Sequence, residues 1–415
     1  MRNSGFWWVI VTLMVLLDVY VFQAIKVVSQ GASPKMKMII YSSYWGVSIA
    51  GVVLLIIIPF INYDSWPRSV RTYLFATVVG LFFAKVLAVV FFLLDDVRRL
   101  IQWASSKLFF NNTEGEDIGS EKISRSVFLS WVGLAAGGGL FGTLLYGFSN
   151  KYNYEVRRVK LSFNKLPAAF KGLKLVHISD IHCGSFTDKK AVTRGVELIL
   201  KQQPDLIVFT GDLVNDRAIE MAPYMDVFSK LSAPLGVYST LGNHDYGDYI
   251  RWESQEIKQA NLERLKEVHG ELGWKLLMNE HVTIEKDGHS IALIGIENWS
   301  SKGNFPRYGK LERAYAGAEI HPFKILLSHD PSHWDGQVKP NFPDIDLMLA
   351  GHTHGMQFGV EVPGFRWSPV QYVYRQWAGL YEEGNQKLYV NRGFGFIGYP
   401  GRVGILPEIT VIELE

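Results

Sequence analysis

The sequence is short of cysteine, of net charge and of repeated segments. Its one cysteine, Cys183, excludes a disulfide within the chain, although it indicates little about the compartment. Lysine and arginine outnumber aspartate and glutamate by only 42 to 40, so the charge gives no sign of a nucleic-acid-binding protein. No internal repeat or low-complexity segment is present. A chain of 415 residues is long enough for two or three ordinary domains.

The two parts of the chain differ in apolar content. Residues 1–150 hold long apolar runs, whereas residues 151–415 hold most of the acids and histidines. Four of these runs are long enough to cross a bilayer, which takes about 20 apolar residues. Because four such runs cannot all be buried inside so small a domain, we predict a membrane domain over residues 1–150. The expected spans are 6–25, 38–61, 73–94 and 127–148.

Two charged side chains, Asp18 and Lys85, fall inside the expected spans. Charged groups within a membrane are candidates for function. The simpler interpretation is that Asp18 lies near an interface and that Lys85 snorkels or pairs within the bundle.

The orientation of the membrane domain rests on the stretch SRSVFLSWVGLAAGGG, which begins at Ser124. The number of basic residues in the inner loops barely distinguishes the two orientations, because one orientation has seven and the other has eight. The stretch resembles a twin-arginine export signal, S-R-R-x-F-L, with one arginine missing. A signal-like fourth span has its basic flank inside and everything after residue 148 outside. We expect a multi-pass protein of the cytoplasmic (inner) membrane, with residues 151–415 on the extracytoplasmic side.

The second part of the chain reads as an α/β domain over residues 172–415, preceded by a polar linker at 151–171. Short apolar runs alternate there with amphipathic stretches, and helices are expected at 189–201, 218–231 and 253–272. This alternation predicts a mainly parallel core sheet. Ligands of such sheets bind just beyond the carboxyl ends of the strands.

Polar residues follow five successive apolar runs, where strands are expected to end. All are oxygen or nitrogen ligands of transition metals, or glycines that let the chain turn. A lone GNHD or HD means little, but five such ends in order predict a metal site. They are Asp180 and His182, Gly211–Asp212, Gly242–Asp245, Ser328–Asp330 and Gly351–His354. His269, His281, His289 and His321 are expected at the surface.

The pattern D-x-H, G-D, G-N-H-D, H, G-H-x-H resembles that of the calcineurin-like metallophosphoesterases, over about residues 170–415. It is most similar to the bacterial YkuE/YaeI-type branch, as is the tail NRGFGFIGYPGRVGILPEITVIEL. The four spans and Met356, which stands where the family often has glycine, depart from that branch.

The resemblance implies an α/β (α+β) fold of four layers, a β-sandwich of two mixed sheets flanked by helices. It also implies two divalent metal ions. Seven side chains would bind them: Asp180, His182 and His354 the first ion, Asn243, His329 and His352 the second, and Asp212 both.

The resemblance makes His244 the group that protonates the leaving oxygen, and Asp245 the group that holds its imidazole. Elementary chemistry agrees with these residue types. Two cations roughly 3.5–4 Å apart can clamp an anionic phosphoester, and a carboxylate such as Asp212 can bridge them. An imidazole supplies a proton near neutral pH. Mixed nitrogen and oxygen ligands suit Mn, Fe or Zn.

The predicted function is a membrane-anchored, metal-dependent phosphoric ester hydrolase. Its substrate would carry a phosphomonoester, phosphodiester or pyrophosphate bond, with lipid-linked and cell-envelope molecules as candidates. One alternative is a non-catalytic membrane sensor or scaffold, which usually shows lost ligands, and none is lost here. Another is a UDP-diacylglucosamine pyrophosphatase, if the domain is cytoplasmic.

Overall fold

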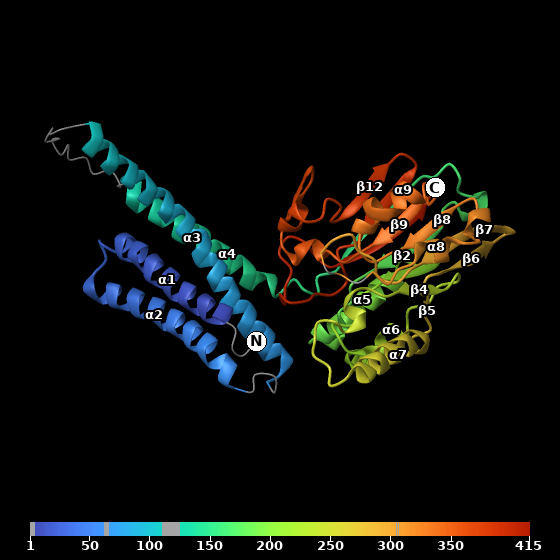
Figure 1. The fold of residues 1–415 in the computed structure, drawn as a ribbon, viewed down its shortest axis with the longest axis horizontal. Helices are drawn as coiled ribbons and strands as arrows, with labels where there is room; N and C mark the ends of the chain where they lie inside the picture. Colours follow the sequence, from blue (N-terminus) through green and yellow to red (C-terminus); the bar gives the residue numbers. More distant parts are fainter. Residues whose placement is uncertain (1–4, 62–65, 110–124, 304, 306) are drawn as a thin grey trace. The chain divides into compact units, whose positions relative to one another are not determined.

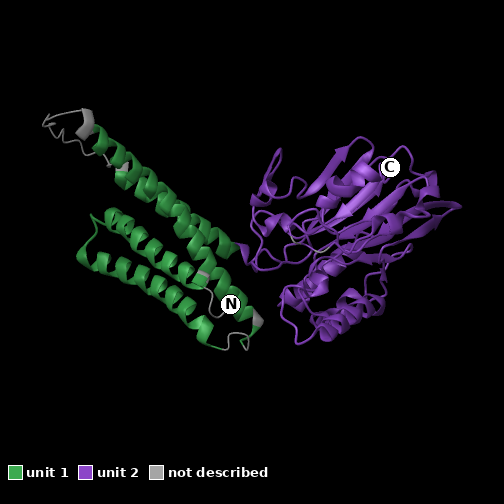
Figure 2. Ribbon diagram, in the orientation of Figure 1, with its two compact units in different colours: residues 1–146 green, residues 147–415 purple. Residues whose placement is uncertain are grey.

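A computed structural model describes residues 5–61, 66–109, 125–303, 305 and 307–415. The chain forms two compact units, residues 1–146 and residues 147–415 (Figure 2). Ser124, the first residue of the stretch that resembles an export signal, lies outside the described residues.

Unit 1 is made of four long apolar helices (Figure 1). They are α1 (Gly5–Val28), α2 (Pro34–Ile57), α3 (Arg68–Phe109) and α4 (Arg125–Gly147). Each is long and apolar enough to cross a membrane, which confirms the four predicted spans.

Helix α3 continues well past the expected end of the third span at residue 94. The extension contains neither glycine nor proline, and Asp95 pairs with Arg98 and Arg99 one turn further on. Such pairs stabilise a helix after its apolar run has ended.

A buried polar cluster joins α1, α2 and α3. Lys85 donates to the Asp18 carboxylate, and Ser48 Oγ donates to the same Oδ1 atom at 2.6 Å. Tyr44 donates to the backbone carbonyl of Asp18 at 2.8 Å. Of the two alternatives for Lys85, snorkelling or pairing within the bundle, the structure shows pairing. Because an unpaired charge in a bilayer is costly, this pair favours one arrangement of the three helices.

Unit 2 contains two six-stranded mixed sheets. The first has the strand order β1-β14-β2-β3-β4-β5, in which β14 is antiparallel to β2 and the other pairs are parallel. Its strands are β1 (Glu155–Leu161), β14 (Glu408–Leu414), β2 (Lys174–Ile178), β3 (Leu206–Thr210), β4 (Val237–Thr240) and β5 (Lys275–Leu276).

The second sheet has the order β12-β13-β9-β8-β7-β6, with antiparallel pairs at its two edges and parallel pairs between them. A separate hairpin pairs β10 with β11. The strands of the sheet are β12 (Gly379–Glu383), β13 (Gln386–Val390), β9 (Leu347–Ala350), β8 (Lys324–Leu327), β7 (His289–Gly295) and β6 (Glu280–Lys286); those of the hairpin are β10 (Val360–Val362) and β11 (Phe365–Trp367).

The two sheets pack face to face between helices, as the alternation of buried side chains shows. In β3, Leu206 and Val208 belong to the core between the sheets, whereas Ile207 and Phe209 pack on the outer face. Successive side chains of a strand point to opposite faces, so both faces of the sheet are covered. The four-layer prediction is thus confirmed. The helices are α5 (Lys189–Leu200), α6 (Met225–Phe228) and α7 (Gln255–Glu271) beside the first sheet, and α8 (Leu311–Tyr315) and α9 (Lys339–Asn341) beside the second.

Two sequence expectations for unit 2 need correction. The segment 151–171 is not a linker, because its residues 155–161 form β1, an edge strand paired with β14 over its whole length. The helix expected at 218–231 is a 3-10 stretch, Ala218–Tyr224, followed by the single turn of α6. Pro223 lacks the N–H that an α-helix needs at that point.

His269 and His321, expected at the surface, are buried. The His269 ring lies against Phe209 and Trp274, and its Nδ1 atom is 2.9 Å from Ser239 Oγ. Burial lowers the pKa of His269 to about 3. The sequence of α7 did not reveal this position, since a polar residue in a helix rich in charged side chains is expected to be exposed.

The unfolding free energy should therefore fall as the pH drops below 6.5. Unfolded chains bind a proton at His269 near pH 6.5, whereas the folded unit resists it until about pH 3. This one group contributes at most about 1.4 kcal/mol per pH unit over that window. Denaturant unfolding of the detergent-solubilised chain should show that His269→Gln loses less unfolding free energy between pH 7 and pH 5 than wild type does. The control His289→Gln, at an exposed position, should behave as wild type. The same dependence of unfolding free energy on pH in all three proteins would contradict this account.

Candidate metal centre

The candidate ligands lie on turns directly after five strands of the two sheets. Asp180 and His182 follow β2, and Asp212 follows β3. The remaining turns come after β4, β8 and β9 and carry Asn243, His329, His352 and His354. Face-to-face packing brings these turns together, so His329 Nδ1, from the second sheet, is 2.6 Å from the Thr210 carbonyl of the first.

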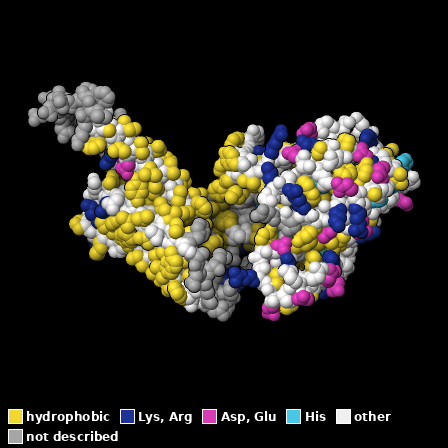
Figure 3. Space-filling view, in the orientation of Figure 1, with side chains coloured by type: hydrophobic (Ala, Val, Ile, Leu, Met, Phe, Trp, Pro, Cys, Tyr) yellow, Lys and Arg dark blue, Asp and Glu magenta, His cyan; other side chains and the backbone are white. Residues whose placement is uncertain are grey.

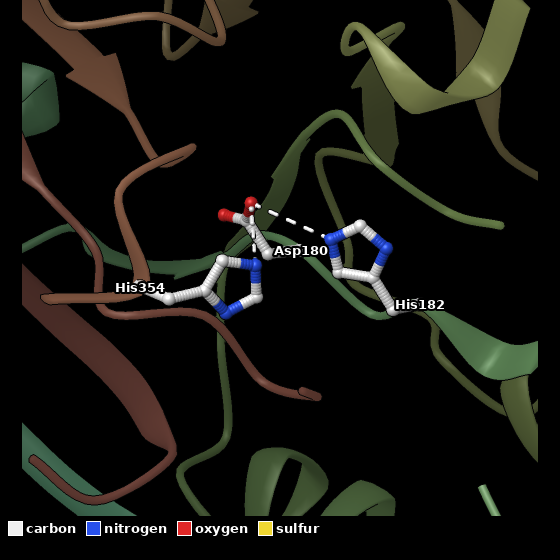
Figure 4. Close-up of side chains that lie close together, drawn as sticks. All are labelled: Asp180, His182 and His354. Atoms are coloured by element: carbon white, nitrogen blue, oxygen red, sulfur yellow. Dashed lines mark ion pairs between the residues drawn. The ribbon is translucent and has the colours of Figure 1, made fainter. Parts of the chain in front are cut away.

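One group of donor atoms consists of Asp180, His182 and His354 (Figure 4). All three are buried, and their ligand atoms lie within 4.8 Å of one another. Asp180 Oδ1 is 3.3 Å from His354 Nε2 and 4.0 Å from His182 Nε2. This group could hold a cation, and it matches the first predicted site.

A second group consists of Asp180, Asp212 and His329, again within 4.8 Å and buried. His329 Nε2 is 3.1 Å from Asp212 Oδ2 and 4.0 Å from Asp180 Oδ1. Asp212 Oδ2 is also 3.5 Å from His182 Nε2, so Asp212 faces both groups. That position is the one a bridging carboxylate needs.

Asn243 and His352 lie beside the second group rather than inside it. Asn243 Oδ1 and His352 Nδ1 are 2.9 Å apart, and the rings of His352 and His329 are 5.2 Å apart. Tyr374 OH lies 2.8 Å from His352 Nε2, and Tyr249 OH accepts a hydrogen bond from Asn243 Nδ2 at 2.7 Å. Neither tyrosine follows a strand, so the pattern of strand ends could not identify them.

The backbone of these turns is strained. Of the ten non-glycine residues with positive φ in the described part of the chain, five are candidate ligands. Residues other than glycine rarely adopt a positive φ, and those that do are concentrated at functional sites. The surrounding sheets must hold these residues in place: Asp180, His182, Asp212, His352 and His354.

The donor atoms suit a bound cation. Both ring nitrogens of His182 and the Nε2 atom of His354 are buried without a hydrogen-bond partner in the structure. Burial lowers the pKa of both imidazoles, which favours their neutral form. Burial opposes ionisation of Asp180 and Asp212, but the neighbouring histidines outweigh it and hold both carboxyl pKa values below their usual range. Neutral imidazole and ionised carboxylate are the forms that bind metals.

His329 differs from the other histidines in its protonation. Burial lowers its pKa, but Asp212 and Asp180 more than compensate and raise it to about 10. A cation at the second group would therefore displace a proton from His329, which makes its binding stronger at higher pH.

His244 is half-buried at the edge of the site, with its ring 5.0 Å from that of His182. Its Nδ1 atom lies 2.8 Å from the carbonyl oxygen of Asn215. A hydrogen bond from Nδ1–H to this carbonyl leaves Nε2 as the atom that can exchange a proton with a substrate.

The prediction that Asp245 holds the His244 imidazole is wrong. The Asp245 carboxylate instead accepts four backbone N–H bonds at 2.8–3.3 Å, as the negative end of a clamp between two turns. Asn215 occupies the place expected for Asp245 at the imidazole. The four donors are the backbone N–H groups of Asp212, Leu213, Val214 and Gly242.

Two buried arginines support the turn that carries His354. Arg392 forms a salt bridge with Glu408 at 2.5 Å, and its backbone carbonyl accepts a hydrogen bond from Arg402. Arg402 instead donates to backbone carbonyls, among them those of His354 and Arg392 at 3.2 and 2.7 Å. Both arginines therefore serve the architecture of the site.

Replacing Gly351 by alanine should weaken cation binding without unfolding the protein. A methyl group at this position would overlap the Asp180 carboxylate and the Ser179 hydroxyl. We expect a loss of about 10- to 100-fold in affinity, as for disturbed ligand orientation elsewhere. Calorimetric titration of the metal-free full chain with Mn²⁺ measures it. The control Gly270→Ala, where nothing lies within 4 Å, should bind as wild type. Equal affinity of Gly351→Ala and wild type would contradict the site geometry.

Comparison with known proteins gives two family matches. Residues 1–151 match the model described as "Probable Calcineurin-like phosphoesterase, transmembrane domain", and residues 173–356 match "Calcineurin-like phosphoesterase". The uncharacterised metallophosphoesterase YkuE of Bacillus subtilis is 30% identical over 71% of this chain and 99% of its own length. The phosphodiesterase YaeI of Escherichia coli is 29% identical over 63% of this chain and 88% of its own length.

A vertebrate relative also has a membrane region. A "transmembrane protein with metallophosphoesterase domain" from Danio rerio is 31% identical over 63% of this chain, and the match covers 57% of that relative's length. The matches extend over the metal-binding turns and over the four-helix unit. The chain belongs to the calcineurin-like metallophosphoesterase family and combines its phosphoesterase domain with the family's four-helix transmembrane domain.

Proposed function

We propose that this protein is a membrane-anchored phosphoesterase that works with two divalent metal ions. The observation that carries the proposal is the pair of buried donor groups that share Asp180, with histidine nitrogens that have no hydrogen-bond partner. Burying a nitrogen without a hydrogen bond costs free energy, and a bound ligand at that nitrogen compensates for this cost. The proximity of the candidate ligands in and beside these groups supports an enzyme over a sensor or scaffold.

Each ion would have its own ligands and share one. Asp212 faces both groups and would bridge the ions. When bound, the ions supply a Lewis acid for the phosphoryl oxygens and an activated water. Mixed nitrogen and oxygen donors suit Mn, Fe or Zn. The proposed ligands are Asp180, His182 and His354 for the first ion, and Asn243, His329 and His352 for the second.

His244 would protonate the leaving oxygen of the substrate. The Asn215 carbonyl orients its ring through Nδ1, and Tyr249 lies against it with ring centroids 4.4 Å apart. A ring fixed from two sides presents Nε2 in one direction, as an acid catalyst must.

The substrate would be a lipid-linked or cell-envelope phosphoester or pyrophosphate. Only residues 148–154 separate the last residue of α4 from the first residue of β1, so the catalytic unit stays close to the membrane surface. A cytoplasmic catalytic unit would instead favour a UDP-diacylglucosamine pyrophosphatase.

Replacing Asp212 by asparagine should lower turnover of bis(p-nitrophenyl) phosphate about a thousandfold or more. The amide has one carbonyl oxygen and no negative charge to share between two cations. Turnover by the purified full chain in detergent with Mn²⁺ measures the loss, and a chelator should abolish wild-type activity reversibly. Asp226→Asn, at an exposed carboxylate paired with Lys189, is the matched control. A metal-loaded wild-type chain that is inert on a broad panel of phosphoesters would support the sensor or scaffold instead.

The orientation of the catalytic unit can be tested with reporters. We propose that it lies on the extracytoplasmic side of the cytoplasmic membrane, so alkaline phosphatase fused after Glu415 should be active and green fluorescent protein should not. The same reporters inserted at Gly31, between α1 and α2, should give the opposite result. A fluorescent fusion after Glu415 would place the catalytic unit in the cytoplasm.

A further inference from the structure

Unit 2 carries one concentrated apolar surface on its exterior. More than half of the large exposed apolar side chains described in this unit fall within residues 356–373, on and around the β10–β11 hairpin. Figure 3 shows hydrophobic side chains gathered at this part of the unit. Soluble proteins rarely expose such a patch unless it binds something. We call these six side chains the hairpin surface: Met356, Val360, Val362, Phe365, Tyr372 and Val373.

The hairpin holds its apolar side chains outward because its charged side chains are bound inward. Glu361 accepts hydrogen bonds from Arg157 at 2.8 and 3.0 Å and from Arg392 at 2.6 Å. Arg366 donates to the Ala378 carbonyl at 2.6 Å. Strands that are polar toward the domain and apolar toward the outside reverse the usual pattern of a water-facing hairpin. Phe365 is therefore 57% exposed.

The base of the hairpin lies beside the residue at which the fourth span ends. Gly147 is the last residue of α4, and its carbonyl accepts a hydrogen bond from Arg402 N–H at 2.9 Å. The next residue, Val403, accepts a bond from Gly359 N–H at 2.8 Å, just before β10 begins. Two such steps between neighbouring chain segments span about 10 Å. The hairpin thus starts close to Gly147, the end of the fourth candidate span.

The same segment is bounded by residues of the candidate metal centre. Met356 comes two residues after His354, and Val373 directly precedes Tyr374. Tyr374 OH is 2.8 Å from His352 Nε2 and 3.1 Å from Asp330 Oδ2. A molecule that covers the hairpin surface therefore lies next to the metal-binding turns.

We propose that the hairpin surface inserts into the interface of the bilayer that anchors the chain. Phenylalanine, tyrosine and valine are suited to this depth, and the exposed Arg375 is suited to lipid phosphates. Insertion holds the metal centre at the level of the head groups. Resting on the proposed function, this assigns the substrate to phosphoesters carried by membrane lipids.

Fluorescence quenching in the full chain tests the insertion. The single natural cysteine, Cys183, is 1% exposed, so Phe365→Cys and Val373→Cys can each be labelled with an environment-sensitive fluorophore. The chain is placed in phosphatidylcholine nanodiscs with and without doxyl-labelled lipid. We expect a blue-shifted emission and loss of fluorescence with doxyl lipid at both positions.

Ile320→Cys is the matched control, because Ile320 is 83% exposed and lies outside the hairpin surface. Its label should be neither shifted nor quenched. Labels at 365 and 373 that behave as the label at 320 does would overturn the proposal, and using two sites guards against a variant that fails to fold. Quenching requires no turnover, so this result is distinguishable from a failure of the proposed function.

Discussion

The face-to-face packing of the two sheets is the constraint on which the candidate site depends. No single sheet carries enough donors, since Asp180, His182 and Asp212 follow strands of the first sheet while His329 and His354 follow strands of the second. Bonds between the sheets fix the alignment, such as that from His329 Nδ1 to the Thr210 carbonyl. The strained turns persist because the layers behind them are fully packed. A shift of one sheet relative to the other would separate both groups of donors.

Much of this site could be predicted from the sequence because each ligand directly follows an apolar run. Position along the chain then stands in for position in space, as it does in parallel sheets. The four spans could likewise be predicted from composition alone. The role of Asp245 was not, because a carboxylate that clamps backbone N–H groups and one that orients an imidazole look alike in a sequence. Tyr374, Tyr249 and the edge strand β1 depend on long-range contacts that no local pattern records.

Polar groups in the two units are used in contrasting ways. In unit 1, Lys85 pairs with Oδ1 of Asp18, and this pairing contributes to the arrangement of the helices. In unit 2, nitrogens of His182 and His354 have no hydrogen-bond partner and could bind a cation. Arg402 belongs to the first kind, since it donates to the carbonyls that surround the His354 turn. Paired buried charges thus contribute to the framework, whereas chemistry is proposed where such histidine nitrogens lie beside Asp180 and Asp212.

The position of β14 has a consequence for biosynthesis. This strand lies between β1 and β2, although more than two hundred residues separate it from either in the chain. While the ribosome is still making residues 162–407, β1 has no neighbour and the sheet is open on one side. The helices of unit 1 have mostly local contacts and can enter the membrane long before then. The protein would therefore be anchored first, and its metal-binding turns would acquire their final support only when residues 408–414 arrive.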